Sequence, residues 1–418
     1  MYRCMSLRIT NYSIIFTLVF MLSVPALYAQ GREYDEVAVL DAATVLPGVT
    51  THGENYFIDP NVKNDGFTNF FTINTQYGVF SAETNSLVLV RLKEINAIRE
   101  LKEMGVVSGV TTGAVDKAVG TVDAAVYFAS DPVGSVSKIP GGMKRMFSNA
   151  SRTSEREQSA GEDSGMREVF GIAANKRKLA LELGVDPYSS NEVLQRELLR
   201  QAKLQFYGKV GVGVAMIPVP AAVAIPIAAT PIAANVSQAI ASESPENLIR
   251  INSEKLAAIG IDAAAITMFM QSPNYSPTHK TIITHALADM QTVNNKAAYM
   301  AHLHTAVNEA DARLRMEQVL LYLQYHTKVG PLAAFHRIVS IPFVETADGK
   351  LVFMGAIDYM TWNRDLASVL NGLPQSLPQA LKNLPRHIWI TGQLSPMARK
   401  NLASLGYSVQ EGAGQALS

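Results

Sequence analysis

The sequence predicts a mixed α+β protein that is mainly helical, with an N-terminal mixed region, a central helical bundle and a small C-terminal α/β unit. Three observations support this fold class: short β-branched and aromatic runs before residue 80, helical periodicity through the middle, and alternating strands and helices at the end. The predicted divisions are 30–147, 166–330 and 331–418. Residues 148–165, which are polar and poor in apolar side chains, form the predicted linker.

The first thirty residues predict a cleavable secretory signal peptide. Arg3 and Arg8 precede a twelve-residue apolar run, and small residues follow at Ala26 and Ala29, either of which fits a cleavage site. The apolar run is too short for a stable transmembrane anchor. We therefore predict that residues 1–29 are removed and that the protein is exported, to the periplasm or outside the cell, either free or attached peripherally to a membrane.

Composition argues against several function classes. The chain has 36 Lys and Arg against 36 Asp and Glu, and the leader takes two arginines with it, so the mature protein has 34 against 36, or −2. This balance argues against a nucleic-acid partner, which favours a basic surface. The only cysteine, Cys4, lies in the leader. The mature protein is therefore predicted to have no disulfide, thiolate metal ligand or cysteine nucleophile.

The N-terminal region is predicted to contain strands followed by a long helix. Residues 36–40 and 67–75 are rich in β-branched, Thr and aromatic residues without helical spacing. Residues 86–104 carry apolar side chains at three- and four-residue steps, and Gly105 stands where a helix would end.

Two segments of the chain are unusually rich in apolar or small residues. In residues 105–129, glycine and alanine recur every four positions, and we favour a tightly packed soluble helix over a membrane helix because three charges fall inside the segment. Residues 210–242 are a run of 33 positions without any charge. Three alternatives remain open for it: a kinked core segment, an apolar loop at a membrane interface, or a re-entrant element. A straight transmembrane helix is not expected, because four prolines interrupt the run: Pro218, Pro220, Pro226 and Pro231.

The central region is predicted to be a series of helices with short loops. One helix covers 166–183, and Ser189 with Glu192 is expected to form a capping box for another over 191–207. Ser244-Pro245 and Ser276-Pro277 each place a cap residue before a proline at the first helical position. The later helices are predicted at 245–260, 262–270, 278–290 and 295–326.

The C-terminal unit is predicted to alternate strands and helices. A first hairpin joins strands 338–344 and 351–357 across Asp348-Gly349. The order strand, helix, strand, helix, strand then favours parallel pairing. These later elements are a helix at 363–370, a strand at 387–391, a helix at 395–406 and a strand at 407–409.

Two stretches carry a resemblance to other proteins. They are Ile390-Thr391-Gly392-Gln393-Leu394-Ser395-Pro396-Met397-Ala398-Arg399, with Leu402 and Leu405-Gly406-Tyr407, and Leu183-Gly184-Val185-Asp186-Pro187-Tyr188-Ser189-Ser190-Asn191. In these motifs the chain resembles a group of uncharacterised exported proteobacterial proteins. The resemblance covers most of the mature chain and implies a bacterial setting, but no activity.

One crevice is a candidate ligand site. If strands 351–357 and 387–391 are parallel neighbours, their carboxyl ends meet at one edge of the sheet, where open α/β sheets bind ligands. The alternative, which we favour, is that Asp358 caps the following turn and Trp362 fills the core. The residues at this edge are Asp358, Tyr359, Trp362, Thr391 and Gln393.

No motif predicts a catalytic residue, a metal site or a cofactor. His302 and His304 lie two positions apart and point away from each other on a regular helix, and His285 with Asp289 supplies only two of the four ligands that a closed metal site needs. Gly211-x-Gly213 lacks the third glycine of a dinucleotide loop, and Ser135-x-x-Lys138 is followed at once by Ile139-Pro140-Gly141, which breaks the helix that its mechanism needs.

The sequence therefore leaves three functions open. The favoured one is a binding or assembly protein of the cell envelope, with an envelope protein or a lipid surface as partner. The second is an enzyme with its site in the C-terminal crevice. The third is a secreted toxin that inserts 105–129 and 210–242 into a membrane.

Overall fold

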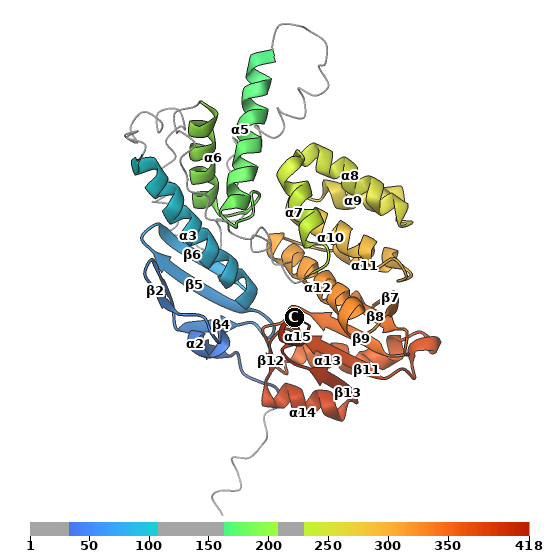
Figure 1. Ribbon diagram of the computed structural model, residues 1–418. Helices are drawn as coiled ribbons and strands as arrows, with labels where there is room; N and C mark the ends of the chain where they lie inside the picture. The colour runs from blue at the N-terminus through green and yellow to red at the C-terminus, as the bar shows by residue number, and fades with distance from the viewer. Residues whose placement is uncertain (1–32, 108–162, 208–229, 418) are drawn as a thin grey trace, which may run out of the picture.

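The computed structural model describes residues 33–107, 163–207 and 230–417 (Figure 1). Helices and sheets are both present, with more residues in helices than in strands, so the mixed α+β class is confirmed at that level. The predicted signal peptide, most of the linker 148–165, nearly all of segment 105–129 and the whole of 210–229 lie outside these residues. We call residues 33–107 with 163–206 the N-terminal lobe, and residues 233–417 the C-terminal lobe.

The N-terminal lobe contains an antiparallel sheet with β5 at its centre. Side chains alternate along β5: Phe71 and Ile73 are buried in the lobe's core, and Phe70 and Thr72 point to the opposite face. The strands are β1 (Val39–Asp41), β2 (His52–Gly53), β3 (Tyr56–Ile58), β4 (Asn61–Asn64), β5 (Asn69–Thr75) and β6 (Gly78–Glu83), and the four-residue helix α2 (Ala42–Val45) follows β1.

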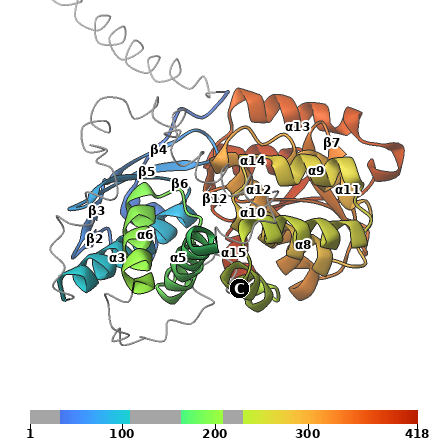
Figure 2. The ribbon, with the colours of Figure 1, turned by 90° about the horizontal axis from the view of Figure 1, so that it is seen from above.

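Three helices lie on one face of this sheet: α3 (Asn85–Val107), α5 (Asp163–Glu182) and α6 (Glu192–Phe206) (Figure 2). The predicted apolar stripe of α3 is confirmed, since Val88, Ile95 and Ile98 are fully buried against the sheet. The predicted end at Gly105 is wrong: the helix continues to Val107.

The cap of α6 also differs from the prediction. Asn191, not Ser189, is the cap, because its side-chain oxygen accepts the backbone N–H of Leu194 at 3.2 Å. The hydroxyl of Ser189 instead donates to the buried carboxylate of Glu94 on α3. A tertiary partner therefore replaces the local capping box.

α5 and α6 share the core of the N-terminal sheet, where Leu179, Leu194 and Leu198 pack with the side chains of α3. The prediction had placed them in one domain with the later helices. Those later helices are α7 (Ala233–Ser242), α8 (Pro245–Ala258), α9 (Ala263–Gln271), α10 (Pro277–Asp289), α11 (Lys296–Leu303) and α12 (Glu309–Lys328).

The described end of the charge-free run 210–242 lies in the hydrophobic core. Ile232, Val236 and Ile240 are almost fully buried, and the last two lie on α7. For this part of the run, the kinked-core alternative is the one that the structure shows. The Ser-Pro starts at Ser244 and Ser276 are confirmed, since each serine accepts a backbone N–H from the first turn of its helix.

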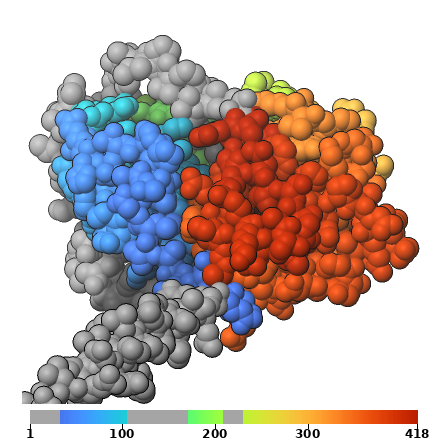
Figure 3. Space-filling model, turned by 90° about the horizontal axis from the view of Figure 1, so that it is seen from below, coloured from blue at the N-terminus to red at the C-terminus, as the bar shows by residue number. Residues whose placement is uncertain are grey.

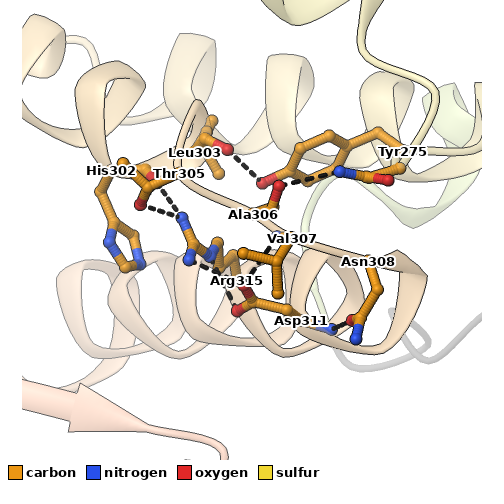
Figure 4. Close-up of polar contacts among 10 residues, drawn as sticks. Tyr275, His302, Leu303, Thr305, Ala306, Val307, Asn308, Asp311 and Arg315 are labelled. Atoms are coloured by element: carbon orange, nitrogen blue, oxygen red, sulfur yellow. Dashed lines mark hydrogen bonds and ion pairs between the residues drawn. The ribbon is translucent and has the colours of Figure 1, made fainter.

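The long helix predicted over 295–326 is broken between α11 and α12 (Figure 4). Asn308 caps α12, and Arg315 reaches back across the turn. Its guanidinium pairs with Asp311 through two hydrogen bonds of 3.0 and 2.8 Å, and donates to the hydroxyl of Thr305 at 2.7 Å and to the carbonyl of His302. Polar side chains within the apparent helical pattern therefore build a turn.

Replacing Arg315 by alanine is expected to lower the free energy of unfolding by about 2 kcal/mol, because Asp311 loses its partner and the turn loses its donors. Urea unfolding measures this change. The matched control is Arg250→Ala, which removes a pair with Glu254 whose side chains are 58% and 65% exposed. An exposed pair should contribute only a few tenths of a kcal/mol. Equal losses in the two variants would contradict the structural role of Arg315.

The C-terminal lobe contains a mixed five-stranded sheet in the order β13-β11-β9-β8-β7. β9, β11 and β13 are parallel, as predicted, and α13 (Arg364–Ser376) and α14 (Pro396–Ser404) lie between them in the chain. The strands are β7 (Leu332–Ile338), β8 (Ile341–Thr346), β9 (Leu351–Gly355), β11 (Arg386–Ile390) and β13 (Tyr407–Gln410); β10 (Tyr359–Met360) and β12 (Gln393–Leu394) form a separate parallel pair, and α15 (Ala413–Ala416) ends the chain.

The hairpin turn at Asp348-Gly349 is confirmed between β8 and β9, with Gly349 at φ 81°. The predicted strand 338–344 begins too early, because the chain turns back at Val339-Ser340 and β8 begins only at Ile341. Both of these residues have positive φ, which their side chains did not predict.

The two faces of this sheet pack against different helices. One face joins a core with α7 to α12 and contributes Phe335, Val344 and Met354. The other joins α13 and α14 through Phe343, Leu351 and residues of β11. The central helices and the C-terminal unit therefore share one core.

Candidate functional site: the polar junction between the lobes

The strand pairing on which the predicted crevice depends is present in the structure. β9 and β11 are parallel neighbours, with Phe353 opposite Ile388. Beyond their ends the segments stay together, since the N–H of Gln393 donates to the carbonyl of Asp358 at 3.0 Å. Gly392 permits this approach, because a Cβ at that position would lie 1.7 Å from the same carbonyl oxygen.

The N-terminal lobe closes this edge of the sheet. The carbonyl of Phe67 accepts the N–H of Asp358 at 2.9 Å, and the carbonyl of Gly66 accepts the N–H of Thr361 at 3.0 Å. Nearby, the carboxylate of Asp35 accepts the N–H of Trp362 at 2.6 Å. Figure 3 shows the N-terminal strands (blue) directly against the C-terminal unit (red). The crevice is therefore a junction between lobes.

Asp358 connects the lobes through its side chain. One carboxylate oxygen accepts the backbone N–H of Asn69 at 3.0 Å and the other accepts that of Asn85 at 3.1 Å. Burial raises the pKa of this carboxyl to about 7; the two backbone hydrogen bonds act against the rise, and the charge of Glu317 adds to it. Asp358 thus caps the start of α3 in the other lobe, not the turn that follows it.

A cavity of about 90 Å³ remains at this junction, and we call it the junction cavity. Of the five predicted residues, Asp358 and Thr391 line it. Tyr359 and Gln393 face each other in the β10–β12 pair, and Trp362 is 6% exposed in the core, as the favoured alternative expected. The other lining residues are Asn85, Ser86, Glu317 and Ala356.

Three residues at the junction had no signal in the sequence. The hydroxyl of Ser86 donates to the carboxylate of Glu317 at 2.7 Å, across a separation of 231 positions. Arg313, one turn before Glu317 on α12, forms an ion pair in which its Nε lies 3.0 Å from the same carboxylate oxygen. Only the meeting of α3 with α12 brings these groups together.

The Leu183–Asn191 motif forms a second polar contact between the lobes. Asp186 accepts the hydroxyl of Thr278 on α10 at 2.7 Å and the N–H of Tyr188 at 2.9 Å. Burial raises the pKa of Asp186 to about 6, and those hydrogen bonds oppose the rise. The motif therefore connects α5 and α6 to the central helices.

The histidines do not converge. His304 bonds the carbonyl of Ala265 at 3.0 Å, while the ring of His302 lies 5.7 Å from that of Tyr299. Within the described ranges, no group of three or more His, Cys, Asp or Glu side chains is arranged to hold a metal ion. In the same part of the chain, no helix has both the length and the apolar character needed to cross a bilayer.

The chain matches no protein-family model, no curated protein and no solved structure.

Proposed function

We propose that this chain is an exported bacterial protein of the periplasm or the cell exterior that binds an envelope protein through the open face of its N-terminal sheet. The leader-like first thirty residues and the resemblance to exported proteobacterial proteins support the location. The observation that carries the binding role is a set of exposed apolar side chains on one sheet face.

The strand register shows which side chains lie on this open face, which we call the outer face. Phe70 lies opposite Lys63 on one side and Glu83 on the other, and Lys63 is also opposite Val39. One row along, Asn74 lies between Phe57 and Val79. Directly opposed residues of antiparallel strands point to the same side. The exposed fractions are 64% for Val39, 36% for Phe57, 38% for Phe70 and 62% for Val79.

The outer face lies opposite α3, α5 and α6, and no described helix or strand packs on it (Figure 2). Gathered apolar side chains of this kind are typical of interaction surfaces. Lys63 and Glu83 lie on the two sides of Phe70, and their opposite charges leave the centre of the face without a net charge. Because anionic lipid headgroups attract basic surfaces, this balance favours a protein partner over a lipid surface.

The toxin alternative gains no support from the described residues. It requires apolar segments free to insert into a membrane, and the described end of the run 210–242 is buried in the core of the C-terminal lobe. The enzyme alternative concerns the junction cavity and is independent of the outer face.

Replacing Val79 by glutamate is expected to weaken binding to native envelope vesicles at least about tenfold, because a charge would be buried at the contact. Co-sedimentation of the purified mature protein measures the affinity. The matched control is Met268→Glu on α9, which changes an apolar side chain that is 58% exposed on the other lobe. We expect the control to bind like the wild type.

Two further arms test the nature of the partner. Proteinase treatment of the vesicles should abolish binding, and flotation with protein-free liposomes of phosphatidylethanolamine and phosphatidylglycerol should recover no protein. Unchanged binding by Val79→Glu contradicts the role of the outer face, and flotation with the liposomes contradicts a protein partner. Fractionation of cells that express the full chain tests export separately.

A further inference from the structure

We propose that the junction cavity is a catalytic site that hydrolyses esters of short acyl groups, with Ser86 as nucleophile and Glu317 as the group that accepts its proton. This activity does not depend on the binding role of the outer face. It rests on four observations: a hydroxyl–carboxylate pair, the cation that is paired with the carboxylate, the backbone that presents the hydroxyl and the size of the cavity.

The first two observations are geometric. A serine hydroxyl becomes a useful nucleophile when a base accepts its proton within hydrogen-bond distance, and a third group holds that base in place. Ser86 Oγ lies 2.7 Å from Glu317 Oε1. Arg313 Nε lies 3.0 Å from the same oxygen, and both side chains of this ion pair are 12% exposed. The carboxylate therefore accepts the Ser86 hydroxyl and lies beside a cation in a largely buried setting.

The third observation is the backbone before Ser86. β6 ends at Glu83, and α3 begins at Asn85, so Thr84 alone makes the turn from strand to helix. Its φ is 93°, a conformation that costs energy for a β-branched residue. The turn places Ser86 in the first turn of a 23-residue helix, where the backbone dipole favours negative charge on a reacting oxygen. Thr84 Oγ1 lies 2.9 Å from Ser86 Oγ.

The fourth observation is the cavity itself. Ser86 and Glu317 both line a space of about 90 Å³, and Thr391 and Asp358 are also among its lining residues. That volume holds an acetyl group but not a long acyl chain. The substrate class is therefore an ester of acetate or a similarly short acid.

The reaction has two balanced steps. In the first, Ser86 Oγ forms a bond to the acyl carbon and gives its proton to Glu317, while the bond from the acyl carbon to the alkoxy oxygen breaks and the leaving alcohol takes the proton from Glu317. In the second, a water oxygen bonds to the acyl carbon and gives a proton to Glu317. The bond to Ser86 Oγ then breaks, and the hydroxyl regains that proton.

Covalent labelling of the full mature protein tests the assignment without any substitution. Methanesulfonyl fluoride carries a group as small as acetyl and sulfonylates activated serines. We expect peptide mass spectrometry to find its adduct on Ser86. An unmodified Ser86 in folded protein, or an equal level of adduct on exposed serines such as Ser404, overturns the proposal.

Hydrolysis of p-nitrophenyl esters provides the second measurement. We expect acetate to be hydrolysed at least about a hundredfold faster than octanoate. Ser86→Ala should reduce the acetate rate to the uncatalysed background, and Glu317→Gln should lower it about a hundredfold or more, the range of a lost proton acceptor. The matched control is Ser404→Ala, which removes an exposed hydroxyl bonded within α14, and its rate should equal the wild type. A wild-type rate in Ser86→Ala, or equal rates with the two esters, contradicts the assignment.

Discussion

Asp358→Ala is expected to lower the free energy of unfolding by about 3–5 kcal/mol. Its two carboxylate oxygens accept backbone N–H groups of Asn69 and Asn85, and each buried donor left without an acceptor costs about 1–3 kcal/mol. Loss of the side chain also leaves a void at the junction. Urea or thermal unfolding at pH 7 measures the change.

The control for this substitution is Asp365→Asn, an exposed aspartate in the first turn of α13. This substitution should lower the free energy of unfolding by about 1 kcal/mol at most. Asp358→Asn should fall between alanine and wild type, because an amide supplies an acceptor oxygen for one of the two N–H groups. A loss below about 1 kcal/mol in Asp358→Ala would show that the contact does not hold the lobes together.

The stability of the wild type relative to Asp358→Asn is expected to rise by about 2–3 kcal/mol as the pH falls from 8 to 5. Burial raises the pKa of Asp358 from 3.8 to about 7, so the folded state binds this proton more tightly than the unfolded chain. The resulting stability is fully present below pH 3.8 and is lost as the pH rises through 7. The asparagine variant has no such proton.

Comparing the two proteins cancels the effects of the other titrating groups. His279 acts in the opposite direction, since burial lowers its pKa to about 3 and stability is lost as the pH falls below 6.5. The difference between the unfolding free energies of wild type and variant isolates Asp358, and chemical denaturation at pH 5, 6, 7 and 8 measures it. A difference that is flat, or that grows toward pH 8, would mean that the two N–H donors outweigh burial.

Elements with local signals could be predicted from the sequence. Ser244-Pro245 and Ser276-Pro277 marked two helix starts correctly, because a cap and a proline act within one turn. The Asp348-Gly349 hairpin and the parallel order of the last strands were also correct. These features depend on neighbouring residues or on short connections.

Where a distant partner competes with a local pattern, the prediction failed. Ser189 had the spacing of a capping box, but its hydroxyl reaches Glu94, 95 positions away. The apolar periodicity of 295–326 continued through a turn that Arg315 and Asp311 hold in place. The reversal at Val339-Ser340 uses positive φ at residues that rarely adopt it, so composition carried no sign of it.

The candidate site also combines residues that the sequence could predict with residues that it could not. Asp358 and Thr391 were predicted to share an edge because strands β9 and β11 belong to one continuous α/β unit. Ser86 and Glu317 were missed because neither lies in a motif, and their contact exists only where α3 meets α12.

By itself the sequence determined the mixed class of the fold, most helix positions, the hairpin at Asp348-Gly349 and the parallel pairing of the last strands, since periodicity, caps and turn residues act over a few positions. Only the tertiary structure decided that the N-terminal lobe closes the predicted crevice and that carboxylates and a serine hydroxyl meet inside it. The physical reason is that burial and long-range hydrogen bonding set the conformation and the proton affinity of these groups, and neither is encoded in any short stretch of the chain.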